Sequence, residues 1–152
     1  MKMRKSLVLT AYMLCLSIVA GVMVLKVPSA AFGIETTVDI HPETLNLKSN
    51  GTWITALIRL PEGYEVGDIN VTTVRLGTVP VAWGNVEGNK LMVEFDRNMV
   101  IDYIWFKLYH MGIERPSPLP KEGVEVELTI TGELIDGTPF KGSDAIRVIY
   151  KS

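Results

Sequence analysis

The feature that most constrains this chain is a period-two alternation of apolar and polar residues within short segments. Residues 124–131 show it most clearly, with Val124, Val126, Leu128 and Ile130 placed between Glu125, Glu127, Thr129 and Thr131. Successive side chains of a β-strand point to opposite faces of the sheet, so such a segment presents one face to a core and the other to solvent. The same alternation occurs over residues 37–40, 44–47, 52–60, 71–76, 79–83, 90–96 and 146–150, with turn residues between them. This pattern predicts an all-β fold, an antiparallel β-sandwich.

The apolar faces of four of these segments predict one common core. Its expected members are Ile54, Ile58, Phe95, Val126, Leu128, Ile130, Ile146 and Val148. Burying each of these side chains contributes roughly 1.5–3 kcal/mol, so together they are able to organise a domain.

Residues 97–123 interrupt the strand pattern and predict one inserted helix with a Pro-rich segment behind it. Asp96 is a typical helix N-cap and Gly112 a typical helix end, and apolar residues recur between them at spacings of three and four. The residues expected to face the sheets are Val100, Ile104, Leu108 and Met111. Residues 115–120, Arg-Pro-Ser-Pro-Leu-Pro, predict a stiff, extended return because proline cannot continue a helix.

The N-terminal segment differs from the rest of the chain. Three basic residues among the first five precede an uncharged run over residues 6–25, and Lys26 follows it. This arrangement predicts a hydrophobic helix that leaves the N-terminus in the cytoplasm and directs the remainder out of it. Residues 29–31, Ser-Ala-Ala, fit cleavage before Phe32, whereas the run is also long enough to span a bilayer. Residues 1–31 are therefore a signal peptide or an N-terminal membrane anchor, and the sandwich domain covers residues 34–152.

Charge and composition exclude several classes of protein. Residues 34–152 hold all 17 acidic residues but only 11 of the 15 basic ones, and they form no basic stripe, which argues against a nucleic-acid partner. No apolar run after residue 33 is long enough to cross a bilayer, so we expect membrane contact through residues 6–25 only. The single cysteine, Cys15, lies in that run, which excludes a disulfide from the exported part.

Two groups of polar residues are candidates for a metal site or a catalytic site. Asp39, His41 and Glu43 alternate and would share one face of a strand as metal ligands, but a solvated strand edge produces the same pattern. Asp96 and Asp102 could form a carboxylate pair, but a helix cap and a charge near the positive helix end account for them. We therefore expect no catalytic residues, no metal, no cofactor and no enzymatic activity.

The candidate partner-binding residues lie on the inserted helix. Ile101, Trp105 and Tyr109 follow one another at intervals of four, and a helix places such residues on one side. Either the Pro-rich return covers them, or they form an exposed aromatic patch for a protein, a glycan or another copy of the chain. Asn50 and Asn70 begin the sequons Asn-Gly-Thr and Asn-Val-Thr and are candidate glycosylation sites.

Five stretches in order carry a resemblance: LNLKSNGTWIT at 45–55, residues 60–69, LMVEFDR at 91–97, residues 126–134 and residues 136–149. Together they cover most of residues 38–150. The chain resembles an exported or cell-surface immunoglobulin-like module of archaea and bacteria that has no established activity. The resemblance implies an immunoglobulin-like sandwich that occurs singly or in tandem.

The chain departs from similar modules in two places. Similar modules often carry an acidic loop before the strand at residue 91, a plausible calcium site. Residues 84–90 here contain one carboxylate and one lysine, which cannot supply the six to eight oxygen ligands that calcium takes, so no calcium site is expected. Residues 105–123 have no counterpart in the usual pattern and represent an insertion.

From these observations we expect a non-enzymatic, exported or cell-surface module with a structural or adhesive role. It would be extracytoplasmic, either secreted or anchored through its N-terminal segment. The alternative is an extracytoplasmic binding or accessory subunit that recognises a protein or a glycan through the aromatic helix insertion.

Overall fold

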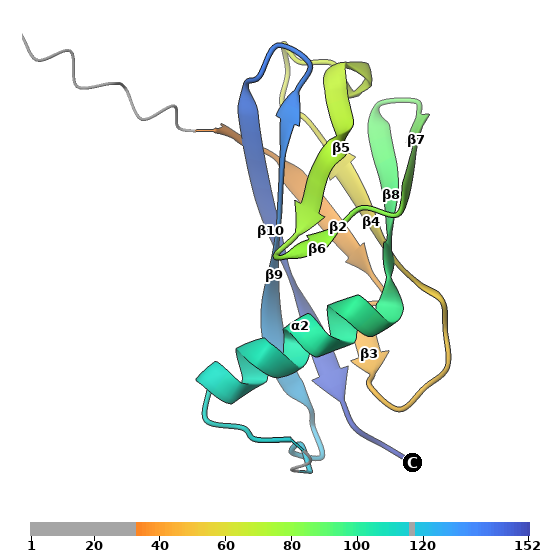
Figure 1. Ribbon diagram of the computed structural model, residues 1–152, viewed down its shortest axis with the longest axis vertical. Helices are drawn as coiled ribbons and strands as arrows, with labels where there is room; N and C mark the ends of the chain where they lie inside the picture. Colours follow the sequence, from red (N-terminus) through yellow and green to blue (C-terminus); the bar gives the residue numbers. More distant parts are fainter. Residues whose placement is uncertain (1–32, 116–117) are drawn as a thin grey trace, which may run out of the picture. The chain divides into compact units, whose positions relative to one another are not determined.

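Two β-sheets face each other, and in the described part of the chain one α-helix lies across one end of them (Figure 1). The computed structural model describes residues 33–115 and 118–152, so the expected signal or anchor segment lies outside the described residues. The strands are β1 (Ile34–Glu35), β2 (Thr37–His41), β3 (Thr44–Asn46), β4 (Trp53–Arg59), β5 (Ile69–Leu76), β6 (Val79–Pro80), β7 (Trp83–Glu87), β8 (Lys90–Asp96), β9 (Val124–Leu134) and β10 (Pro139–Ile149). A 3₁₀ turn, η1 (Val66–Asp68), precedes β5, and the helix is α2 (Arg97–His110). The predicted all-β architecture of two sheets with one helix is confirmed.

The two sheets are built from different parts of the chain. The six-stranded sheet has the order β1-β10-β9-β5-β6, with β3 also paired to β10, and the four-stranded sheet has the order β2-β4-β8-β7. All pairs are antiparallel except β1 with β10 and β3 with β10, so the expected purely antiparallel sandwich is wrong at one edge. The reason is that residues 34–46 pair in turn with both sheets. They lie beside β10 as β1, cross to the other sheet and pair with β4 as β2, and then return beside β10 as β3.

This crossing segment joins the two sheets at one side of the sandwich. Ile40 on β2 donates its backbone N–H to Asp144 Oδ2 on β10, at 2.8 Å. A strand at a sheet edge otherwise leaves such donors unpaired. The carboxylate of Asp144, from the opposite sheet, therefore satisfies one backbone donor at the edge of β2.

The core lies between the sheets and follows the alternation of the sequence. The eight residues predicted to form it are all buried, with at most 1% of each exposed, and they belong to one cluster. In β4 and β8 every second residue is buried, because one face of each strand points toward the six-stranded sheet. The prediction of a common core is confirmed.

Helix α2 follows β8 without a connecting loop. Its N-cap is Asp96, whose Oδ1 accepts the backbone N–H of Met99 at 3.0 Å, and Gly112 follows its C-terminal end with a φ of +84°. Val100, Ile104 and Leu108 are fully buried as expected. Met111 is 53% exposed, and its predicted orientation is wrong because the helix has ended at His110 and the chain reverses there.

Candidate functional site

The three candidate residues on α2 do not share one environment. Ile101 and Trp105 are buried, with 8% and 7% of each exposed, whereas Tyr109 is 60% exposed. Four residues span more than one turn of an α-helix, which has 3.6 residues per turn. Each residue of the series Ile101, Trp105 and Tyr109 therefore lies further around the helix axis than the one before. Over two steps this drift carries Tyr109 from the core to solvent. The structure brings Ile101 and Trp105 together and leaves Tyr109 outside.

Trp105 is enclosed by side chains from two other segments. The ring of Tyr150, just beyond β10, meets it edge to face with ring centroids 5.9 Å apart. The guanidinium of Arg115, at the start of the Pro-rich return, lies 5.4 Å from the centroid of the indole ring and forms an ion pair with Asp102 at 3.4 Å. Leu119 is buried in the same cluster. The return thus contributes an arginine and a leucine to this end of the core, while Pro118 and Pro120 are exposed.

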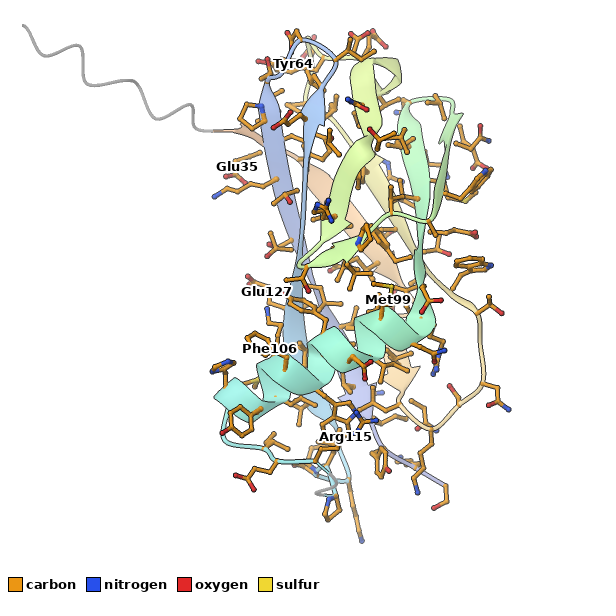
Figure 2. The ribbon with its side chains drawn as sticks, viewed as in Figure 1. Glu35, Tyr64, Met99, Phe106, Arg115 and Glu127 are labelled. Atoms are coloured by element: carbon orange, nitrogen blue, oxygen red, sulfur yellow. The ribbon has the colours of Figure 1, made fainter. Side chains whose placement is uncertain are left out.

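The side of α2 that remains exposed carries aromatic residues that the sequence did not single out. Phe106 is 58% exposed and Met99 is 47% exposed, and Figure 2 shows both along the helix. Phe106 packs beside Tyr103, with ring centroids 6.4 Å apart, and meets His110 edge to face at 4.5 Å. Met99, Tyr103 and Phe106 also line a shallow, mainly apolar groove with Thr78, Val79 and Asp102. This groove and the ring of Tyr109 are available to a partner.

The two sequon asparagines differ in accessibility. Asn50 is exposed in the loop between β3 and β4. Asn70 is half-buried on β5, and its Oδ1 accepts the hydroxyl of Thr72 at 2.8 Å. Of the two, Asn50 offers the more accessible amide for modification.

Most of the polar residues that are candidates for a metal or catalytic site form ion pairs or hydrogen bonds with other residues of the protein. His41 Nε2 and Asp39 Oδ1 lie 3.2 Å apart on β2, and Glu43 is exposed beyond that strand. Asp96 caps α2, and Asp102 pairs with Arg115. Within residues 33–115 and 118–152, no group of three or more histidine, cysteine, aspartate or glutamate side chains is placed to hold a metal ion.

The β7–β8 and β9–β10 turns each carry a carboxylate. Residues 84–90, where similar modules carry an acidic loop, form the β7–β8 hairpin, with Glu87 and Lys90 directly opposite each other. At the β9–β10 turn, the backbone N–H of Thr138 donates to Asp136 and lowers the pKa of that carboxyl below its usual range. This turn is an exposed Asx turn, which accounts for the shift without a catalytic role.

The chain matches no protein-family model, no curated protein and no solved structure. In the part of the chain that the structure describes, no helix has the length and apolar character needed to cross a bilayer.

Proposed function

We propose that this protein is a non-enzymatic, extracytoplasmic module with an immunoglobulin-like fold and a structural or adhesive role at the cell surface. The observation that carries the fold assignment is the strand order. An immunoglobulin sandwich has the orders A-B-E-D and G-F-C in its two sheets. The order β2-β4-β8-β7 supports the first, and β10-β9-β5 with β6 at its edge supports the second. Helix α2 then lies between strands E and F.

The side chains between the sheets support a fold held by apolar packing alone. Antibody domains join strands B and F by a disulfide across the core. The corresponding strands here, β4 and β9, contribute fully buried aliphatic residues such as Ile54, Ile58 and Leu128 instead. A fold of this kind needs no oxidising step, so it suits any extracytoplasmic compartment.

The extracytoplasmic assignment rests on the basic and apolar N-terminal segment, and a reporter fusion tests it. A phosphatase that is active only outside the cytoplasm is fused to the C-terminus of the full chain. We expect activity, and we expect it to be lost when Leu16→Arg and Val19→Arg interrupt the apolar run. Equal activity in both fusions, or none in either, would contradict export through this segment. Mass spectrometry of the product decides between cleavage before Phe32 and a retained anchor.

The alternative is a binding or accessory subunit that recognises a protein or a glycan through α2. The exposed ring of Tyr109 and the apolar groove at Phe106 favour it, whereas Trp105 and Ile101 are engaged in the core. If this alternative holds, Phe106→Ala and Tyr109→Ala should abolish association and leave stability nearly unchanged.

A further inference from the structure

Two exposed tryptophans lie on the outer face of the four-stranded sheet, far along the chain from each other. Trp53 on β4 is 45% exposed and Trp83 on β7 is 50% exposed. The central strand β8 separates them, with Trp53 opposite Asp96 and Trp83 opposite Glu94. Two strand spacings and an offset of two residues place their Cα atoms roughly 12 Å apart. Both side chains point away from the core, because Ile54, next to Trp53, and Val93, opposite the residue that follows Trp83, are fully buried within it.

Polar side chains occupy the surface between and beside the two rings. Glu94 is directly opposite both Thr55 and Trp83 in the register, and it lies diagonally next to Trp53. His41, opposite Thr55, extends the same row onto β2. Neighbours of this kind have Cβ atoms about 4.5–5.5 Å apart when opposite and about 7–8 Å when diagonal. The carboxylate of Glu94 is thus positioned between two aromatic rings.

The exposure of these two tryptophans has no structural explanation in the described part of the chain. Trp105 shows the contrast, since it is buried against Tyr150 and Arg115. Neither Trp53 nor Trp83 pairs with another aromatic ring or with a cation among the described residues. A large aromatic side chain left in water forgoes most of the stability that its burial would give. Two of them on one sheet face therefore point to a ligand.

We infer that the outer face of this sheet binds a neutral polysaccharide chain, with Trp53 and Trp83 as stacking platforms and Glu94 as a hydrogen-bond acceptor between them. The face of an aromatic ring carries partial negative charge and attracts the polarised C–H groups of a sugar ring. A carboxylate accepts hydrogen bonds only, which complements the hydroxyl groups of a sugar. The roughly 12 Å between the two Cα atoms leaves room for a further sugar unit between the two that stack.

The acidic residues on this sheet face argue against other classes of ligand. Glu94 and Asp96 lie opposite Trp83 and Trp53 on the same sheet face, and they repel nucleic acids, anionic lipids and sulfated glycans. The basic Lys90 on β8 lies two rows from Glu94, beyond Met92. A protein partner generally requires a contiguous apolar centre, whereas a polar row lies between these rings. This surface is separate from α2, so the inference does not depend on the proposed structural role or on the helix alternative.

The test uses the full chain in a detergent without a sugar headgroup, because residues 6–25 are apolar and a glycosidic detergent would compete. The probes are insoluble cellulose and chitin in pull-down assays, and soluble xylan, mannan and β-glucan in affinity electrophoresis. We expect retention by at least one of these polysaccharides. We also expect its soluble oligosaccharides to protect tryptophan emission from acrylamide quenching, since Trp53 and Trp83 are accessible to the quencher and Trp105 is buried.

Single substitutions then test whether the sheet face that carries Trp53 and Trp83 is the binding site. Trp53→Ala and Trp83→Ala should each weaken binding by about tenfold or more, as expected for an aromatic hot spot. Tyr64→Ala removes an equally exposed ring from the turn between β4 and η1 and should leave binding unchanged, whereas loss of binding in Phe106→Ala would place the site on α2. Melting curves show whether each variant is folded, and Trp83→Thr replaces Trp83→Ala if the edge strand needs a better β-former. The quenching assay on the unsubstituted protein needs no variant.

Several results would overturn the inference. These are retention by none of the five polysaccharides, binding that survives the double Trp53→Ala, Trp83→Ala variant, or binding that is lost with Phe106→Ala instead. Binding restricted to a sulfated glycan or a nucleic acid would also overturn it, because it would show that the carboxylates do not set the selectivity.

Discussion

The ring of Tyr103 on α2 lies directly against Gly77 in the β5–β6 turn, in the space that a Cβ at that position would occupy. Gly77 also has a φ of +56°, and its backbone N–H donates to the carbonyl of Thr129 at 2.9 Å. The glycine therefore permits both the turn and the close approach of the helix to the six-stranded sheet.

Replacing this glycine tests the contact. Gly77→Ala should lower the free energy of unfolding by about 2–4 kcal/mol, from the left-handed backbone and the overlap with Tyr103 together. Gly88→Ala is the matched control, because Gly88 has a φ of +62° but no heavy atom within 4 Å of an added Cβ. It should cost only about 1 kcal/mol. Equal losses in urea denaturation would show that Tyr103 does not occupy this position.

Trp105 and Tyr109 should respond differently to truncation. Trp105→Ala should lower the free energy of unfolding by about 3–5 kcal/mol, the usual range for emptying a buried tryptophan site. Tyr109→Ala should change it by no more than about 0.5 kcal/mol, because the ring is exposed. Thermal melts and sedimentation measure stability and association for both variants. A Trp105→Ala protein that is as stable as the original but no longer associates would place Trp105 in an interface instead.

Arg97 is a buried cation held by neutral acceptors. Only 6% of it is exposed, and its Nη2 donates to the carbonyl of Asn46 at 2.8 Å and to Ser49 Oγ at 3.0 Å. Arg97→Ala should cost about 2–3 kcal/mol because hydrogen bonds to a charged donor are lost and the loop before β4 is released. Arg97→Lys keeps one charged donor and should cost less. Denaturant titrations that rank the two variants in the opposite order would contradict this role.

The hydrogen bond between Ile40 on β2 and Asp144 on β10 predicts a local effect on stability and on amide exchange. Asp144→Ala removes the acceptor of the Ile40 N–H and should cost about 1–3 kcal/mol. Asp144→Asn keeps a side-chain oxygen in the same place and should cost less. Amide hydrogen exchange of Ile40, followed by NMR, is the direct measurement. Unchanged protection of this amide in Asp144→Ala would show that the hydrogen bond does not close this edge.

Calcium should not stabilise the protein. The β7–β8 hairpin presents Glu87 opposite Lys90, and this pair cannot supply the oxygen ligands that calcium takes. We expect the same melting temperature with millimolar calcium and with a chelator. A rise of several degrees that the chelator reverses would reveal a site elsewhere in the chain.

The sequence by itself indicated most of the strands and most of the core, but not β1 or the hairpin strand β7. Alternation with a period of two assigns each residue to one of two faces, and this sufficed to identify Ile54, Phe95 and Val126 as core residues. Capping chemistry at Asp96 and Gly112 likewise located the ends of α2, because caps depend on neighbouring residues only.

Only the tertiary structure decided which segments meet. Local alternation carries no information about pairing partners, so it could not show that β1 and β3 flank β10 in parallel while β2 joins the other sheet. It could not separate the buried Trp105 from the exposed Tyr109, because the side chains that cover Trp105, Tyr150 and Arg115, come from other segments of the chain. The juxtaposition of Trp53 and Trp83 across β8 likewise depends on long-range register. Pairing and register follow from the packing of the whole core, which no local segment contains.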